Sequence, residues 1–213
     1  MRILITGFEA WAGKKNPSGM IAKNLDGKAI KGLDVIGRVL PEDFYALPGL
    51  SKKLIAEIRP DAVISTGWDY TKAIKVEKIA LNVMNSFFVD SVVPDNYGNK
   101  PSHEPIIRNA PIALQSTLPA DEIVQELRKN NIPAVVSYYA GTHCCNTVMY
   151  SFLHTDKVKI SGFIHVPPLP EMVKGVRTDS IVMSIDEQEK AIQLAIEVCA
   201  RHLLPSEKDG HQG

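Results

Sequence analysis

Short apolar runs alternate with amphipathic stretches along the whole chain of 213 residues. The apolar runs predict buried strands, and they occupy residues 2–8, 34–40, 61–67, 74–84, 134–141 and 159–168. Apolar positions at helical spacing predict helices over residues 16–25, 46–60, 118–133, 142–154 and 184–204. Strands interleaved with helices indicate an α/β fold, in which a mostly parallel central sheet lies between two helical layers (α/β/α).

Polar residues mark the ends of two of these helices. Asn16 is a good N-cap, and Pro17 suits the first helical position. Ser184 and Glu187 have the spacing of a capping box ahead of the last helix. These signals support helices that begin near residues 17 and 185.

The remaining chain predicts one domain over residues 1–213. Residues 85–111 show no helical period and are rich in turn-forming residues, so we expect a long loop, which in compact domains is often functional. The polar stretch at about 206–213 is expected to be a frayed tail. We find no internal repeat and no low-complexity segment.

Composition excludes several classes of function. Lys and Arg together number 24, as do Asp and Glu, so no basic excess points to nucleic acid. No apolar run reaches the roughly 18 residues of a membrane span. Residues 1–10 are expected to form a strand and not a signal peptide, and the odd count of three cysteines favours free thiols. We therefore expect a cytoplasmic protein without a membrane or nucleic-acid partner.

Parallel sheets bind ligands beyond the carboxyl ends of their strands, and this rule selects candidate site positions. They are Phe8–Gly13, Thr66–Lys72, Gly141–Cys145 and His165.

Three interpretations of the cysteines have to be weighed. Residues 143, 144 and 145 diverge by about 100° each on a helix, so they cannot all converge on one ion, and we expect no metal. Cys199 falls on an apolar helical face and is expected to be a small core residue. Cys145 begins an apolar stripe but also lies in the first turn of a helix, where backbone N–H groups lower a thiol pKa. Position alone leaves Cys145 open between core packing and a nucleophile.

A thiol nucleophile needs a base and an orienting acceptor. His165 ends an apolar strand, which favours a site residue over a core histidine bonded to a backbone carbonyl. Strand alternation places Glu77 on an apolar face, where a histidine donor would satisfy it, although a twist of the strand end into water is an equal alternative.

At these residues the chain resembles the pyroglutamyl peptidase I (pyrrolidone-carboxyl peptidase) family of cytosolic cysteine peptidases. The matching stretches occur in order: "ITGFE" at 5–9, "NPS" at 16–18, "GRVLP" at 37–41, "VEKIALN" at 76–82, "STLP" at 116–119, "AGTHCCNTVMY" at 140–150 and "SGFIHVPPLPE" at 161–171. Together they span nearly the whole chain. The resemblance implies a phosphorylase/hydrolase-like α/β fold that needs no cofactor.

The resemblance also implies residue roles. Glu77, Cys145 and His165 correspond to the catalytic triad, and Phe8 and Trp11 to two aromatic walls around a pyroglutamyl ring. The implied substrates are peptides with an N-terminal pyroglutamyl residue, and the implied assembly is a homotetramer or dimer. Cys144 takes the place of an apolar family residue, and neither it nor His143 receives a role.

Three loops depart from the family pattern, at residues 10–12, 67–72 and 83–93. They surround the expected pocket and therefore bear on specificity and rate. Two other functions remain open: a non-catalytic or altered-specificity binding protein on the same fold, and a nucleoside phosphorylase-like enzyme. The second would need an anion site, and the sequence shows no phosphate loop.

Overall fold

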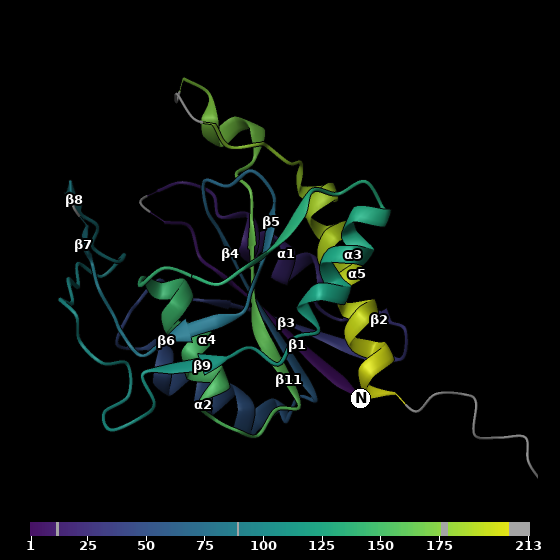
Figure 1. Ribbon diagram of the computed structural model, residues 1–213, viewed down its shortest axis with the longest axis horizontal. Coiled ribbons are helices and arrows are strands. Elements are labelled where there is room, and N and C mark those ends of the chain that lie inside the picture. Colours follow the sequence, from purple (N-terminus) through teal and green to yellow (C-terminus); the bar gives the residue numbers. More distant parts are fainter. Residues whose placement is uncertain (12, 89, 176–178, 205–213) are drawn as a thin grey trace, which may run out of the picture.

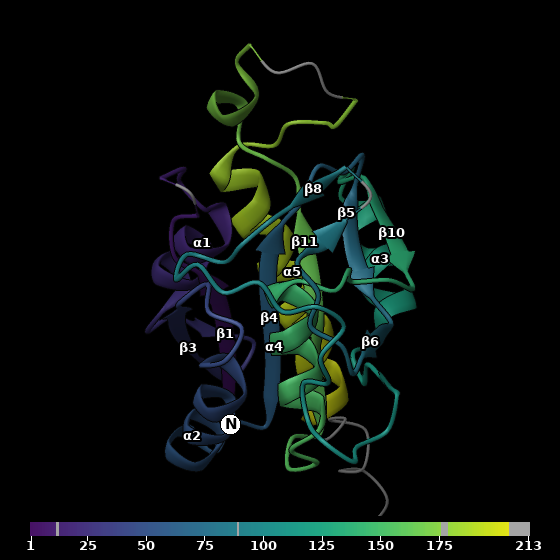
Figure 2. The ribbon, with the colours of Figure 1, turned by 90° about the vertical axis from the view of Figure 1, so that its left-hand side faces the viewer.

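A central sheet lies between two layers of helices (Figures 1 and 2). The computed structural model describes residues 1–11, 13–88, 90–175 and 179–204. Ala12, in the first of the three divergent loops, and the expected frayed tail at 206–213 lie outside the described residues.

Seven strands form the main sheet. In spatial order they are β10 (Ala134–Ser137), β5 (Ile74–Glu77), β11 (Ile160–Val166), β4 (Ala62–Trp68), β1 (Arg2–Phe8), β3 (Leu33–Leu40) and β2 (Ala29–Ile30). The central strands are buried along almost their whole length, since both faces of the sheet are covered. The prediction of a three-layer α/β fold with a mostly parallel sheet is confirmed.

The helices divide between the two faces. One layer consists of α1 (Pro17–Leu25), α3 (Ala120–Lys129) and α5 (Ile185–Leu203), and the other of α2 (Leu47–Ile58) and α4 (Cys144–Leu153). Each layer has its own apolar core against the sheet. The capping signals are confirmed: the Asn16 side chain accepts from the Ser18 N–H, and Ser184 and Glu187 form a capping box.

Two strand pairs in the main sheet are antiparallel, and the sequence pattern predicted neither: β2 with β3 at one edge, and β5 with β11 inside the sheet. Strands β1, β3, β4 and β11 run parallel, whereas β5 runs antiparallel to β11, and β10 follows β5. Phe163 faces Glu77 in the β11–β5 register, and His165 faces Lys75. Glu77, the last residue of β5, thus lies two residues away from His165 along the register, and its side chain reaches the His165 ring.

The prediction of one strand over residues 74–84 is wrong. The chain leaves the main sheet after Glu77, and β6 (Ile79–Leu81) pairs with β9 (Ala113–Gln115) in a separate two-stranded sheet. The buried Asn146 side chain accounts for part of this break, because it binds both the N–H and the carbonyl of Leu81. Those two groups therefore do not continue a ladder with the main sheet.

Two further expectations about length need adjustment. The strand expected over 134–141 is only four residues long, since β10 ends at Ser137. The loop expected over 85–111 carries a small hairpin of β7 (Phe87–Phe88) and β8 (Ser91–Val92), and a short 3-10 helix, η1 (Pro170–Val173), follows β11. Within the described ranges, every helix is too short or too polar to cross a membrane.

Candidate active site

A buried histidine–carboxylate pair lies at the carboxyl end of β11. The Nδ1 atom of His165 is 2.8 Å from Oε1 of Glu77, whose carboxylate has no exposed surface. Since a carboxylate only accepts, Nδ1 donates this hydrogen bond, and Nε2 of His165 is left on the cavity side of the ring. The alternative of a Glu77 twisted into water is excluded, and so is a His165 bonded only to backbone.

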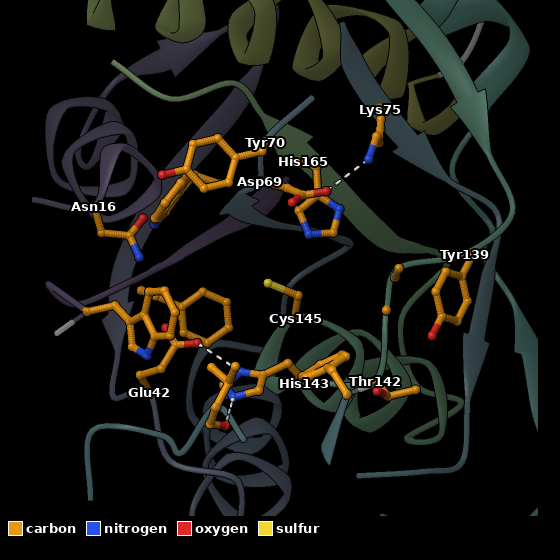
Figure 3. Close-up of a pocket in the computed structure, with 17 residues that line it drawn as sticks. Asn16, Glu42, Asp69, Tyr70, Lys75, Tyr139, Thr142, His143, Cys145 and His165 are labelled. Atoms are coloured by element: carbon orange, nitrogen blue, oxygen red, sulfur yellow. Dashed lines mark hydrogen bonds and ion pairs between the residues drawn. The ribbon is translucent and has the colours of Figure 1, made fainter. Parts of the chain in front are cut away.

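Cys145 reaches the same place from the start of α4. The sequence rule placed residues 141–145 at a strand end, but β10 runs the opposite way, and residues 138–143 carry the chain back across the site. Gly141 makes the turn with φ of +83°, which a glycine adopts without strain. Figure 3 shows the Cys145 sulfur directed to the part of the cavity where the His165 ring lies.

Gly67 provides the space that the Cys145 sulfur occupies. In the register of β4 and β11, Gly67 is the partner of His165. A Cβ atom built at Gly67 would lie 2.8 Å from the Cys145 Sγ and 2.8 Å from the ring of Phe163. The absence of a side chain at residue 67 thus lets the thiol settle beside the strand that carries His165.

The net shift of the Cys145 pKa is upward, whereas the position at the helix start predicted a lowered pKa. Burial raises the pKa of this thiol well above its ordinary value, and the carboxylates of Glu42, Asp69 and Glu77 raise it further. The hydrogen bond from the Cys145 backbone N–H acts in the opposite direction but is weaker. This direction favours a thiol over a thiolate, so nucleophilic chemistry at Cys145 would use a base to remove the proton.

A cavity of about 410 Å³ lies beside the Glu77–His165 pair and Cys145. Both predicted aromatic residues, Phe8 and Trp11, line it, and so do Cys145 and His165. Two of the divergent loops contribute as well: residues 67–72 supply Trp68, Asp69 and Tyr70, and residues 83–93 supply Phe88 and Val93. The structure thus gathers the candidate residues of the sequence at one place, and their roles are considered below.

Two charged cavity residues, Glu42 and Lys75, were not predicted from the sequence, whereas Asp69 lies in the range 66–72 that the strand-end rule selected. Glu42 follows the carboxyl end of β3, and Asp69 pairs with Lys75 at 2.9 Å across the strand ends (Figure 3). The strand-end rule was applied to four strands only, and its application to residues 34–40 would have found Glu42. Lys75 carried no comparable signal, because its access to the cavity depends on the reversed direction of β5.

Asn146 was also missed, although it adjoins Cys145. Its Oδ1 atom accepts from the Leu81 N–H at 2.8 Å, and its Nδ2 atom donates to the carbonyls of Leu81 (2.8 Å) and Val83 (2.9 Å). The Asn146 side chain is fully buried, and its three bonds hold the first turn of α4 against residues 81–83.

Helical periodicity chose the wrong member of the cysteine pair for the core. Cys144, which lies off the apolar stripe, is fully buried, whereas Cys145, which starts the stripe, is partly exposed. The reason is that the loop containing Glu42 and Phe44 covers the Cys144 side of α4. Cys199 is fully buried in the core as predicted, and burial raises its pKa to about 12.

The other histidines are placed away from Glu77. His143 pairs with Glu42, His202 with Glu122, and His154 stacks on Tyr150. His103 lies in the exposed loop, and His211 falls outside the described residues.

Comparison with known proteins finds relatives along almost the whole chain. Residues 1–202 match the pyroglutamyl peptidase family. The pyrrolidone-carboxylate peptidase of Pyrococcus furiosus is 41% identical over 96% of this chain and 100% of its own length. That of Thermococcus litoralis is 41% identical over 98% of this chain and 96% of its own length.

Solved structures point to the same relatives. The X-ray structure of pyrrolidone carboxyl peptidase from Pyrococcus furiosus superimposes with a TM-score of 0.89 at 40% identity, covering 96% of this chain and 100% of the other. A mutant form of the same peptidase gives a TM-score of 0.88 at the same identity and coverage. The whole-chain match, the fold and the grouping of a cysteine with a histidine–glutamate pair lead to one conclusion: this chain belongs to the pyroglutamyl peptidase family of cysteine hydrolases.

Proposed function

We propose that the chain is a thiol exopeptidase that removes an N-terminal pyroglutamyl residue from peptides through Glu77, Cys145 and His165. The observation that carries the proposal is the 2.8 Å bond between His165 and the fully buried Glu77, on the cavity that also holds Cys145. A buried carboxylate that fixes an imidazole beside a thiol is the arrangement that nucleophilic catalysis requires.

In the proposed reaction, His165 acts twice on one proton. Its Nε2 atom takes the proton of the neutral Cys145 thiol as the sulfur attacks the carbonyl that joins pyroglutamate to the next residue. The imidazolium then protonates the leaving amine, the C–N bond breaks, and a pyroglutamyl thioester remains on Cys145. Water, deprotonated by His165, hydrolyses the thioester and regenerates the thiol. Glu77 keeps the ring in one tautomer and stabilises its positive charge.

The first turn of α4 supplies the oxyanion site. The helix begins at Cys144, and the first N–H groups of a helix have no partner within it. They point toward the carbonyl oxygen that becomes negative during attack on Cys145, and the helix dipole acts in the same sense.

Phe8 and Trp11 are proposed to contact the flat, neutral lactam ring. An N-terminal prolyl residue has the same ring size but carries a charged amine and lacks the lactam oxygen. The carboxylate of Asp69 in the cavity already pairs with Lys75, so it is not free for that amine. An unsatisfied buried group costs about 1–3 kcal/mol, so prolyl amides should be hydrolysed roughly a hundredfold less efficiently.

The decisive experiment compares three matched variants. Cys145→Ser should abolish hydrolysis of pyroglutamyl-aminocoumarin, whereas Cys144→Ser and Cys199→Ser should keep most of it, because only Cys145 lines the cavity. Full activity of Cys145→Ser would refute the mechanism. A folded wild-type protein that binds pyroglutamate in a thermal-shift assay without hydrolysis would favour the binding protein instead. Phosphate-dependent cleavage of nucleosides would favour the phosphorylase.

We further propose a cytoplasmic homotetramer or dimer in which residues 1–213 form one catalytic domain, without nucleic-acid or membrane partners. The balanced charge of 24 basic and 24 acidic residues supports the absence of nucleic acid. Exposed apolar side chains on the β7–β8 hairpin, namely Phe87, Phe88 and Val92, support self-association. Sedimentation equilibrium measures the assembly, and a monomer would contradict it.

A further inference from the structure

Three potential metal ligands converge beside the proposed active site without taking part in it. Glu42 comes from the loop after β3, His143 is the N-cap of α4, and Cys144 is its first residue. One carboxylate oxygen, one ring nitrogen and the sulfur of these residues all lie within 4.8 Å of one another. Glu42 and Cys144 are buried, and His143 is half-buried.

The hydrogen bonds of His143 fix which ring nitrogen faces the cluster. Its Nε2 atom is 3.1 Å from the carbonyl oxygen of Val93, and a carbonyl only accepts, so Nε2 carries a proton and donates it. On the neutral ring, Nδ1 then has a lone pair. That lone pair faces the Glu42 carboxylate, 3.6 Å away (Figure 3). Two acceptors that face each other in a largely buried place call for a cation between them.

The third ligand in the cluster, Cys144, indicates which kind of cation would bind there. A proton on His143 would need only Glu42, whereas the cluster adds the thiol of Cys144, a free and fully buried cysteine. One nitrogen, one oxygen and one sulfur ligand form a donor set typical of zinc. A histidine whose second nitrogen donates to a backbone carbonyl is also the usual support of a metal-binding imidazole, and Val93 provides that carbonyl.

We propose that Glu42, His143 and Cys144 form a binding site for one zinc-class divalent cation, with the remaining coordination position open to the cavity. Glu42 and His143 line that cavity, so solvent has access. Sequence reasoning rejected a site made of residues 143–145 because consecutive side chains diverge. The structure removes this objection, because Glu42 joins from a segment about 100 residues away in sequence, in place of Cys145.

The three ligand atoms would need to move only slightly closer together to bind zinc. Zinc binds nitrogen and oxygen at about 2.0–2.2 Å and sulfur at about 2.3 Å, so tetrahedral ligand atoms lie roughly 3.5 Å apart. The His143–Glu42 distance of 3.6 Å already fits. The widest separation of up to 4.8 Å has to close by about 1 Å. This inference does not rest on the proposed function, because neither Cys145 nor His165 belongs to the cluster.

The test uses Co²⁺ as a spectroscopic probe of the full chain after removal of metals with a chelator. In a Cys145→Ser background, which removes competition from the proposed nucleophile, one Co²⁺ per chain should bind and give a thiolate-to-cobalt charge-transfer band that Zn²⁺ displaces. Adding Cys199→Ser should leave the band intact. Adding Cys144→Ser should abolish it, and Glu42→Gln should weaken binding by at least about 10–100-fold.

A second measurement distinguishes loss of metal binding from misfolding caused by a substitution at the buried residue 144. Zn²⁺ should raise the Tm of Cys145→Ser, since a ligand that binds only the folded state stabilises it. It should not raise the Tm of Cys144→Ala/Cys145→Ser, whose alanine keeps an apolar contact at residue 144. A charge-transfer band that persists without Cys144, or its absence in Cys145→Ser, would overturn the proposal.

Discussion

The Glu77–His165 pair is the contact on which the proposed chemistry depends at the residue scale. In the proposed reaction the imidazole becomes positively charged, and Glu77 is the fully buried carboxylate 2.8 Å from its Nδ1 atom. Oε2 of Glu77 has no hydrogen-bond partner within the described part of the chain, so only Oε1 anchors the ring. A change at Glu77 should therefore affect turnover through His165.

Glu77→Gln should keep the fold and lower kcat/KM for a pyroglutamyl amide by about 10²–10⁴-fold. The amide retains the shape of the side chain but loses the charge that stabilises the imidazolium. Steady-state kinetics over a range of pH provides the measurement, with Glu57→Gln on the exposed face of α2 as the matched control. Wild-type activity of Glu77→Gln at every pH would show that the orienting role is wrong.

A substitution at Gly67 tests whether activity requires the present position of the Cys145 thiol. Gly67→Ala adds a Cβ atom 2.8 Å from the sulfur of Cys145 and from the Phe163 ring, so both have to shift. Overpacking of this kind costs about 1–3 kcal/mol, and we expect activity to fall at least tenfold.

A glycine in open space provides the control for that substitution. Gly49 lies in α2, and a Cβ atom there meets nothing within 4 Å. Gly49→Ala should leave activity unchanged and stabilise the fold by about 0.5–1 kcal/mol. Urea unfolding measures the stability of both variants, and hydrolysis assays measure their activity. Equal activity of the two variants would show that activity does not depend on the absence of a side chain at residue 67.

At the scale of elements, Asn146 joins α4 to β6. Asn146→Asp replaces the amide donor with a carboxylate that faces the carbonyls of Leu81 and Val83, 2.8 and 2.9 Å from the present Nδ2 atom. Each buried group left without a partner costs about 1–3 kcal/mol, so the free energy of unfolding should fall by roughly 2–4 kcal/mol. Guanidinium unfolding checks this, with the exposed Asn109→Asp as control. An unchanged midpoint for Asn146→Asp would show that the clamp contributes nothing.

The helices and strands also show which features of the fold the sequence patterns predict. Continuous apolar runs predicted the strands β1, β4 and β11, because buried parallel strands leave little choice of side chain. The same patterns contain no information about strand direction, so the reversal of β5 and β10 was not predicted. They also failed after Glu77, where residues 78–81 pair with residues 113–116 and Asn146 binds Leu81, so the chain does not continue the main sheet.

The residues of the candidate site also divide into those that the sequence predicted and those that it did not. Cys145 and His165 were found from their positions at the ends of elements, and the family resemblance chose them together with Glu77, Phe8 and Trp11. Glu42 and Lys75 were missed: the strand-end rule was not extended to residues 34–40, and the access of Lys75 to the cavity depends on the direction of β5. The pKa of Cys145 was misjudged for a related reason. Burial and three carboxylates from distant segments outweigh the local effect of the helix start.

At the scale of the whole molecule, the buried thiols link stability to alkaline pH. Burial raises the pKa of Cys199 from 9.0 to about 12, so the folded chain holds this proton more tightly than the unfolded chain. The stabilisation is complete below about pH 9 and is lost as pH rises toward 12.

Cys199→Ala should remove that dependence. The difference in free energy of unfolding between wild type and variant should shrink by about 1 kcal/mol between pH 9 and pH 10. Urea unfolding at pH 8, 9 and 10 measures it, and all other titrating groups are common to both proteins. A difference that stays constant across this range would show that Cys199 titrates normally in the folded state.

The most direct test of the account is covalent labelling by a pyroglutamyl chloromethyl ketone. The lactam should place the reagent in the cavity, where the Cys145 sulfur displaces chloride and becomes covalently bound to the reagent. Peptide mapping by mass spectrometry should find one label per chain on Cys145, formed in step with the loss of hydrolysis and slowed by free pyroglutamate. A label on Cys144 or Cys199 in its place, or complete labelling of Cys145 with full activity, would contradict the assignment of Cys145 as the nucleophile.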